Sequence, residues 1–164
     1  MARASYIEPS LDEWLKLFKF KTEIKVRISE TDLSGHVNNT SYFVYFEQAR
    51  AEFLECLGFY QENIGAVTAD LVCHFHGEAF FPNTLVVGVR VAKLSQKSMD
   101  LEYYIQSSRE HRLVATGRGA LVMMDKTAKK STIIPEPIRK EIEKREISIR
   151  GSDPHSAKVK IDKV

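Results

Sequence analysis

The chain has 164 residues, of which 43% are hydrophobic and 28% charged, and its formal net charge is +2. This length and composition are typical of one globular domain with a sizeable core. A net charge so close to zero gives no reason to expect nucleic acid or a membrane surface as a partner. We therefore predict that the protein binds neither nucleic acid nor a membrane.

Three features of the sequence predict the cellular compartment of the protein. No run approaches the roughly 18 consecutive apolar residues of a membrane-spanning helix, and the N-terminus lacks the apolar core of a secretory signal. The two cysteines, Cys56 and Cys73, lie in apolar stretches with a spacing that fits neither a zinc knuckle nor a redox pair. We expect both to be buried free thiols in a cytoplasmic protein.

The first predicted elements are a short helix and a strand. A helix is expected over 10–19, because Ser10 and Glu13 have the spacing of a capping box. Residues 22–30 alternate apolar and charged side chains, which predicts a half-buried strand. Its expected inward-facing residues are Ile24, Val26 and Ile28.

A long helix is predicted over 39–57, with Gly58 as its stop signal. Apolar residues recur there every three or four positions. They are Tyr42, Phe43, Phe46, Ala49, Phe53, Leu54 and Leu57. This aromatic content is too high for a surface helix, so we expect a sheet to wrap around it.

Four strand-like runs follow, separated by short turns, and then a charged helix. The predicted strands cover 66–81, 85–94, 99–107 and 113–125, and the helix covers 136–146. Such short connections imply antiparallel neighbours, because parallel strands need long crossovers.

This order predicts an α+β fold in which a long central helix is wrapped by a five-stranded antiparallel sheet. We expect a single domain over 1–147, with short helices near both ends, and a polar tail over 148–164. Such a sheet has two open edges, and pairing with a second copy would help to cover them.

The most informative stretch is 30–39, Glu-Thr-Asp-Leu-Ser-Gly-His-Val-Asn-Asn, at the junction between the first strand and the long helix. It places the Asp32 carboxylate beside the unsatisfied N–H groups of a helix start. A carboxylate there can attack an activated carbonyl, or activate a water, while the N–H groups stabilise the charge on the oxygen. Taken alone, Asp32 would be a turn or capping aspartate. Within the whole stretch the chemical role is favoured.

With Val26-Arg27, Tyr42, Glu47-Ala49-Arg50 and Ala115-Thr116-Gly117, this stretch resembles the hot-dog fold thioesterases. The resemblance is to the 4-hydroxybenzoyl-CoA thioesterase-like branch and runs from about residue 22 to 145. It implies a hot-dog fold, a homodimer or homotetramer built by pairing of sheets, and a site at the dimer interface. The implied reaction is hydrolysis of an acyl-CoA to free acid and CoA, with no metal and no cofactor beyond the CoA of the substrate.

The same resemblance implies roles for four residues. Asp32 matches the catalytic carboxylate, and Asn39 matches the position whose backbone N–H polarises the thioester carbonyl. Lys97 and Ser98 match part of a basic turn that contacts CoA phosphates, although the two preceding residues stand where one relative has arginines.

Other polar residues have plainer interpretations. We expect His36 to bond within its loop, and Glu47 and Arg50 to form an ion pair on the helix face. His74 and His76 lie on one face of a strand and could bind zinc, but no third ligand is evident. The prediction is no metal site, with both histidines facing either the acyl pocket or the outer surface.

Two other functions stay open. The chain could hydrolyse acyl groups carried on acyl carrier protein, whose acidic surface would suit the basic excess near the C-terminus. It could also be a non-catalytic acyl-CoA-binding module, because fold does not fix function. A hot-dog hydratase is disfavoured, since residues 32–36 lack the Asp–His dyad with an Asn-Pro segment that this branch uses.

Overall fold

The computed structural model describes residues 4–146, so the predicted tail over 148–164 lies outside the described residues. Five strands form one antiparallel sheet in the order β1-β3-β4-β5-β2. They are β1 (Phe20–Lys25), β2 (Ile64–Phe75), β3 (Thr84–Leu94), β4 (Ser98–Ser107) and β5 (Leu113–Asp125). β1 and β2 are the edge strands, and β2 contains a bulge between Thr68 and Asp70.

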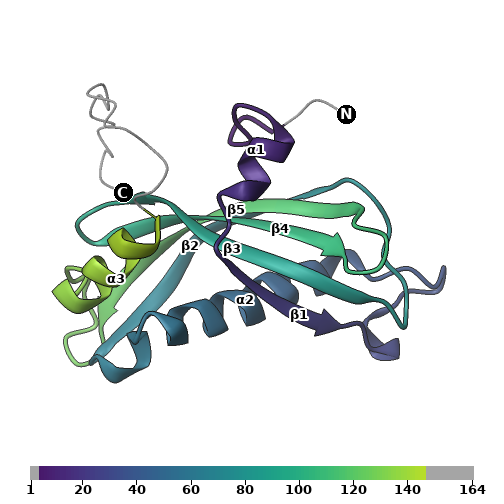
Figure 1. Cartoon of the computed structure of the whole chain (residues 1–164). Coiled ribbons are helices and arrows are strands. Elements are labelled where there is room, and N and C mark those ends of the chain that lie inside the picture. The colour runs from purple at the N-terminus through teal and green to yellow at the C-terminus, as the bar shows by residue number, and fades with distance from the viewer. Residues whose placement is uncertain (1–3, 147–164) are drawn as a thin grey trace.

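Three α-helices accompany the sheet. The long helix α2 (Asn39–Cys56) lies across one face, α1 (Leu11–Lys16) lies on the opposite face, and α3 (Glu136–Glu146) lies at one end (Figure 1). This α+β arrangement is the hot-dog fold, which confirms the predicted fold class. Within residues 4–146, no helix combines the length and the apolar character needed to cross a membrane.

The inner face of the sheet holds the main core, and Phe46 of α2 is at its centre. The Phe46 side chain is fully buried, and its ring lies 4.8 Å from the Tyr103 ring. Gly117 of β5 lies directly under this ring. A Cβ at Gly117 would sit 2.7 Å from Phe46 and 2.8 Å from the Val72 carbonyl oxygen, so a larger residue would push α2 away from the sheet.

The outer face is covered in part by α1, through a second cluster of buried residues that includes Trp14, Phe18 and Tyr104. The indole N–H of Trp14 donates to the Glu102 carboxylate at 2.6 Å, and the Arg90 Nε donates to the same oxygen at 2.9 Å. α1 therefore shields an ion pair, and its hydrogen bond satisfies part of the charge that burial would otherwise leave uncompensated.

The first strand is shorter than predicted. It ends at Lys25, and residues Ile28–Glu30 form a 3-10 turn instead of continuing the strand. The Glu30 carboxylate accepts a hydrogen bond from the Arg27 backbone N–H at 2.8 Å, which bends the chain. Ile28, expected to face inward, is 67% exposed as a result.

Two further expectations need correction. The strand predicted over 66–81 ends at Phe75, because residues 76–83 form a loop that is bonded to the segment before α2. Cys56, expected to be buried, is exposed at the end of α2, whereas Cys73 is half-buried. Burial raises the pKa of the Cys73 thiol to about 12, so only Cys73 has the protected environment predicted for both.

We predict that Trp14→Ala lowers the free energy of unfolding by about 3–5 kcal/mol, because it removes a fully buried aromatic side chain and a hydrogen bond to a buried carboxylate. Urea unfolding followed by circular dichroism measures this difference. Trp14→Phe is the matched control, since it keeps one aromatic ring and removes the indole N–H with only part of the buried volume. An unchanged unfolding midpoint for Trp14→Ala would show that α1 contributes nothing to stability.

Candidate active site

Residues 31–37 form a small hairpin directly before α2. Thr31 and Val37 form a β-bridge, and the Asp32 N–H donates to the His36 carbonyl at 2.8 Å. Gly35 turns the chain with a φ of +79°, a conformation that a residue with a side chain adopts only with strain. Asp32, on the first arm, and Asn39, which follows the second arm at the start of α2, therefore lie at one end of the molecule.

The Asp32 carboxylate has two different environments for its two oxygens. Oδ1 accepts hydrogen bonds from the backbone N–H groups of Ser34 at 2.8 Å and His36 at 3.3 Å. Oδ2 has no hydrogen-bond donor among the described residues, and the side chain is exposed. One oxygen thus shapes the turn, as an ordinary turn aspartate does, while the other is available for chemistry.

The start of α2 offers N–H donors at the same place. Asn38 is the N-cap, and its side-chain oxygen accepts from the Thr40 N–H at 3.0 Å. Asn39 is the first helical residue, and its N–H has no acceptor within the described part of the chain. An 18-residue helix adds its dipole to such an unpaired amide, which favours negative charge there.

Glu30 ties the hairpin to the body of α2. Its carbonyl oxygen accepts from the Asn38 N–H at 2.8 Å and from the Ser41 hydroxyl at 3.2 Å. Its carboxylate accepts from the Tyr45 hydroxyl at 2.8 Å. Burial, followed by the contact with Glu30, raises the pKa of Tyr45, so this hydroxyl stays a donor. The sequence interpretation missed this pair, because nothing local connects residues 15 positions apart.

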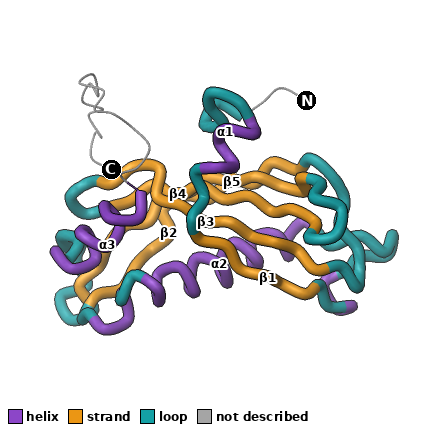
Figure 2. The backbone as a smooth tube through the Cα atoms, viewed as in Figure 1, coloured by secondary structure: helices purple, strands orange, loops and turns teal. Residues whose placement is uncertain are grey.

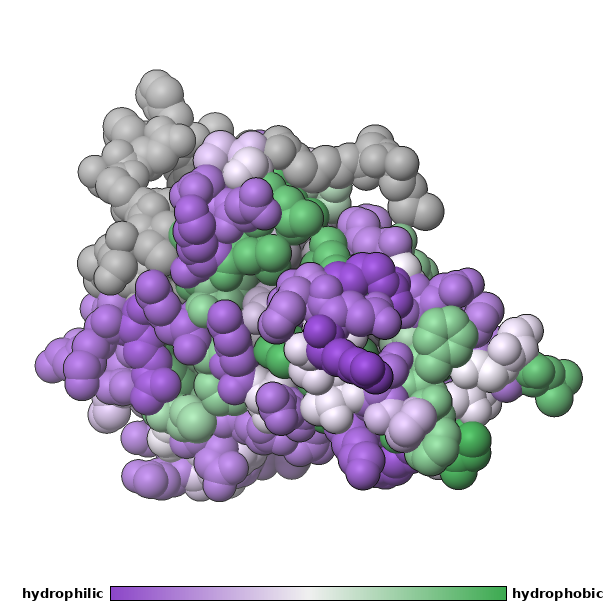
Figure 3. Space-filling view, turned by 45° about the vertical axis from the view of Figure 1, so that its right-hand side comes forward, coloured by the Kyte–Doolittle hydropathy of each residue, from purple (hydrophilic) through white to green (hydrophobic). Residues whose placement is uncertain are grey.

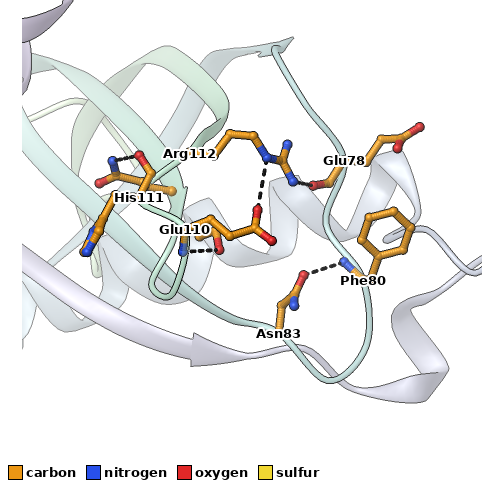
Figure 4. A network of polar contacts seen from close by, with 8 residues as sticks. Glu78, Phe80, Asn83, Glu110, His111 and Arg112 are labelled. Carbon is orange, nitrogen blue, oxygen red and sulfur yellow. Dashed lines mark hydrogen bonds and ion pairs between the residues drawn. The ribbon is translucent and has the colours of Figure 1, made fainter.

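The loop over 76–83 braces the hairpin from the other side. The His36 ring packs edge-on against Phe80 with centroids 4.9 Å apart, and its Nδ1 lies 3.6 Å from a Glu78 carboxylate oxygen. The His36 side chain therefore contacts this neighbouring loop, whereas it was expected to bond within its own loop. Arg112 holds the loop from the β4–β5 turn, donating to the Glu78 carbonyl at 2.7 Å and to Glu110 at 3.2 Å (Figure 4).

The predicted CoA-contacting residues lie at the opposite end of the sheet. Lys97 and Ser98 are at the β3–β4 turn, whereas the hairpin adjoins the start of β3 (Figure 2). An 11-residue strand separates the two places, which is a span of about 35 Å. Within one chain the structure therefore does not bring Lys97 and Ser98 to Asp32.

His74 of β2 and His76, just after its end, face the outer surface, one of the two predicted alternatives. The Tyr6 hydroxyl lies 2.8 Å from Nδ1 of His74 and donates to the Thr116 hydroxyl at 3.0 Å. Nε2 of His76 lies 2.9 Å from the same Thr116 oxygen. Burial and the neighbouring His74 lower the pKa of His76. No group of three metal-ligating side chains occurs within residues 4–146.

A cavity of about 230 Å³ lies between α2 and β2, and Arg50 is its most unusual lining residue. The Arg50 side chain is only 12% exposed, and its Nη2 is 4.0 Å from a carboxylate oxygen of the well exposed Glu47. Nη1 is buried and has no hydrogen-bond partner among the described residues. The expected ion pair on the helix face is thus at its distance limit, and Arg50 points inward.

Comparison with known proteins shows the family of the chain. The chain belongs to the thioesterase-like superfamily, whose family model matches residues 26–142. The long-chain acyl-CoA thioesterase FadM of Escherichia coli is 28% identical over 127 residues, which are 75% of this chain and 96% of that protein.

Two solved structures extend the likeness. The PA2801 protein of Pseudomonas aeruginosa is 30% identical, with a TM-score of 0.71 over 76% of this chain and 98% of that one. The DHNA-CoA thioesterase of Staphylococcus aureus is 25% identical, with a TM-score of 0.67 over 76% of this chain and 88% of that one.

We predict that Tyr45→Phe loosens the hairpin, because the Glu30 carboxylate loses the hydroxyl that joins it to α2. The expected loss of stability is about 1 kcal/mol, the usual value for one hydrogen bond. Hydrogen exchange of the backbone amides over 31–38 should accelerate, while exchange in β4 stays as in the wild type. Equal protection of the hairpin in both proteins would show that Glu30 does not depend on Tyr45.

Proposed function

We propose that the protein is an acyl-CoA thioesterase, which hydrolyses an acyl-CoA to a free acid and CoA. The observation that carries the proposal is the free Oδ2 of the exposed Asp32 on the hairpin that leads into the unpaired N–H of Asn39. A carboxylate and an oxyanion donor at one place are the two parts that hydrolysis of a thioester requires.

In the proposed reaction the thioester carbonyl oxygen points at the Asn39 N–H. As a general base, Asp32 takes a proton from water while the water oxygen bonds to the carbonyl carbon. As a nucleophile, Asp32 itself forms that bond and gives an acyl-aspartyl anhydride, which water then hydrolyses. In both routes negative charge develops on the carbonyl oxygen beside the helix start, the C–S bond breaks, and the CoA thiolate leaves and takes up a proton. Neither route requires a metal.

CoA is the proposed thiol because relatives with different acyl groups share it. FadM is a long-chain acyl-CoA thioesterase, and the S. aureus relative is a DHNA-CoA thioesterase. An acyl-carrier-protein thioester is the alternative substrate, and it would use the same Asp32 and Asn39. Turnover of matched acyl groups on CoA and on acyl carrier protein separates the two.

We further propose that two copies pair through β2. This strand is a sheet edge, and residues Val67, Thr68, Ala69 and Asp70 in its middle are exposed. Hydrophobic side chains are also exposed at the end of the molecule that carries the hairpin (Figure 3). They include Leu33, Phe43, Phe75, Phe80 and Phe81. A homodimer would cover part of this surface, and a homotetramer is the alternative assembly.

We predict that Asp32→Asn retains the fold and loses hydrolysis by a factor of about 10²–10⁴, the contribution of a positioned acid–base group. The side-chain oxygen of Asn can still accept from Ser34 and His36, so the hairpin keeps its hydrogen bonds. A thiol-release assay on acyl-CoA esters of several lengths measures the loss. Ser34→Ala is the control, because its contact with Asp32 is through the backbone. Near-wild-type turnover by folded Asp32→Asn would remove Asp32 from the mechanism, and binding without turnover by the wild type would favour a non-catalytic module.

We predict that Lys97→Ala raises the KM for CoA esters more than it lowers kcat, because it removes one positive charge from the turn proposed to contact the CoA phosphates. In a dimer this turn would serve the site of the other copy, since it is remote from Asp32 of its own chain. The effect should shrink as salt is added. Lys93→Ala, on the adjacent strand end, is the matched control. Kinetics that do not change at low ionic strength would exclude a phosphate contact by Lys97.

A further inference from the structure

The guanidinium of Arg50 lies in the α2–β2 cavity without the partners that a buried charge needs. One of its nitrogens is buried and unpaired, and its nearest carboxylate, on Glu47, is 4.0 Å away with a side chain that is 73% exposed. Its hydrogen bond to the Tyr103 hydroxyl supplies a neutral partner only. Buried polar groups are almost always hydrogen-bonded, so a buried cation with one unpaired nitrogen and a carboxylate no nearer than 4.0 Å can take a further acceptor from the cavity that Arg50 lines.

Apart from the exposed Glu47, the described lining of the cavity adds no acidic side chain that could balance Arg50. Its second cationic lining residue is Lys126, and Glu47 is the only acidic one. The remaining wall is mainly apolar or small, with Ala51, Leu54 and Ile64 among its members. A largely apolar space with cationic donors at its wall is suited to a small group that carries an oxygen atom.

The position of the cavity ties it to the active site of a second copy. Arg50 is about 16 Å along the helix axis from Asn39 of its own chain, which is too far for a short acyl group. The start of α2 lies at the Phe75 end of β2, where the Tyr42 and Phe75 rings are 5.1 Å apart, and the cavity lies at the Ile64 end. Antiparallel pairing of two β2 strands about Val67–Asp70 sets the Ile64 end of one copy beside the Phe75 end of the other.

We propose that Arg50 is a specificity-determining residue that donates a hydrogen bond to an oxygen atom on the acyl group whose thioester is held at Asp32 and Asn39 of the partner copy. The inference rests on the proposed function and narrows its substrate class. The preferred acyl groups are short and carry a hydroxyl or a carboxylate away from the thioester. The volume of about 230 Å³ is below the roughly 300–1,000 Å³ of pockets that enclose drug-sized ligands, which suits a short acyl group.

The test compares three six-carbon substrates, hexanoyl-CoA, 6-hydroxyhexanoyl-CoA and adipoyl-CoA. We expect wild-type kcat/KM to be at least about tenfold higher for one of the oxygenated substrates than for hexanoyl-CoA, because a hydrogen bond to a charged donor has that strength. Which of the two is preferred tells whether the acceptor is neutral or anionic. Equal kcat/KM for all three in the wild type would overturn the proposal without any variant.

Variants then assign the preference to Arg50. Arg50→Met should bring the ratio between oxygenated and plain substrate to about one, mainly through KM. Lys21→Met, which removes an exposed cation from β1 at the sheet edge away from β2, is the matched control and should keep the wild-type ratio. A second variant, Ala51→Leu, fills the cavity from α2 and should exclude six-carbon groups while acetyl-CoA is still accepted. A ratio that persists in folded Arg50→Met would overturn the assignment.

Subunit mixing tests whether the cavity serves the other copy. Asp32→Asn and Arg50→Met chains, each impaired alone toward the oxygenated substrate, should together recover about a quarter of wild-type activity, since about half of random dimers are mixed and each has one site with both native residues. No recovery, with mixed dimers demonstrated by native mass spectrometry, would place Arg50 and Asp32 in one chain and overturn the composite site.

The proposed function and the Arg50 proposal fail in different ways. Hydrolysis with no preference among the three substrates would leave the thioesterase intact and overturn the role of Arg50. If no thioester is hydrolysed, calorimetry of the same three ligands still measures their affinities. Tighter binding of an oxygenated ligand that Arg50→Met abolishes would support Arg50 as a ligand contact in a protein without the proposed activity.

Discussion

The close contact between Phe46 and the backbone of Gly117 sets the position of everything at the candidate site. Because β5 has no side chain at that point, the aromatic ring rests on the sheet and α2 lies as deep as the strands allow. A long helix fixed at its middle also has a fixed first turn. The unpaired amide of Asn39 thereby has a defined position relative to the sheet, as its proposed role as an oxyanion donor requires.

The shape of the hairpin depends on a different kind of contact. It has few buried apolar contacts of its own, and its shape comes from hydrogen bonds made by Glu30, Asp32 and the backbone of residues 31–38. Polar contacts of this kind keep a carboxylate in place and leave it exposed. Apolar packing would have buried Asp32 and made its charged form costly.

The sequence allowed the helices, the antiparallel order and the place of Asp32 and Asn39 to be predicted, because periodicity and capping are local signals. Features that depend on distant residues were missed. The first strand ends early since Glu30 captures the Arg27 amide, and the strand after α2 ends early since residues 76–83 bond to the hairpin. Arg50 was expected to form an ion pair on the helix face because it lies three residues after Glu47. Its burial could not be predicted, because it depends on where β2 lies. Cys56 lies in an apolar stretch, yet it occupies the exposed side of the helix end.

One feature of the outer face has a practical consequence for spectroscopy. The chain has a single tryptophan, Trp14, and its indole N–H is bonded to Glu102 beneath α1, on the side of the sheet away from α2. Intrinsic fluorescence of the native protein therefore reports whether the N-terminal segment is docked. The hairpin leads into α2 on the other side of the sheet, so titrations that follow a ligand there call for a probe introduced at that end of the molecule.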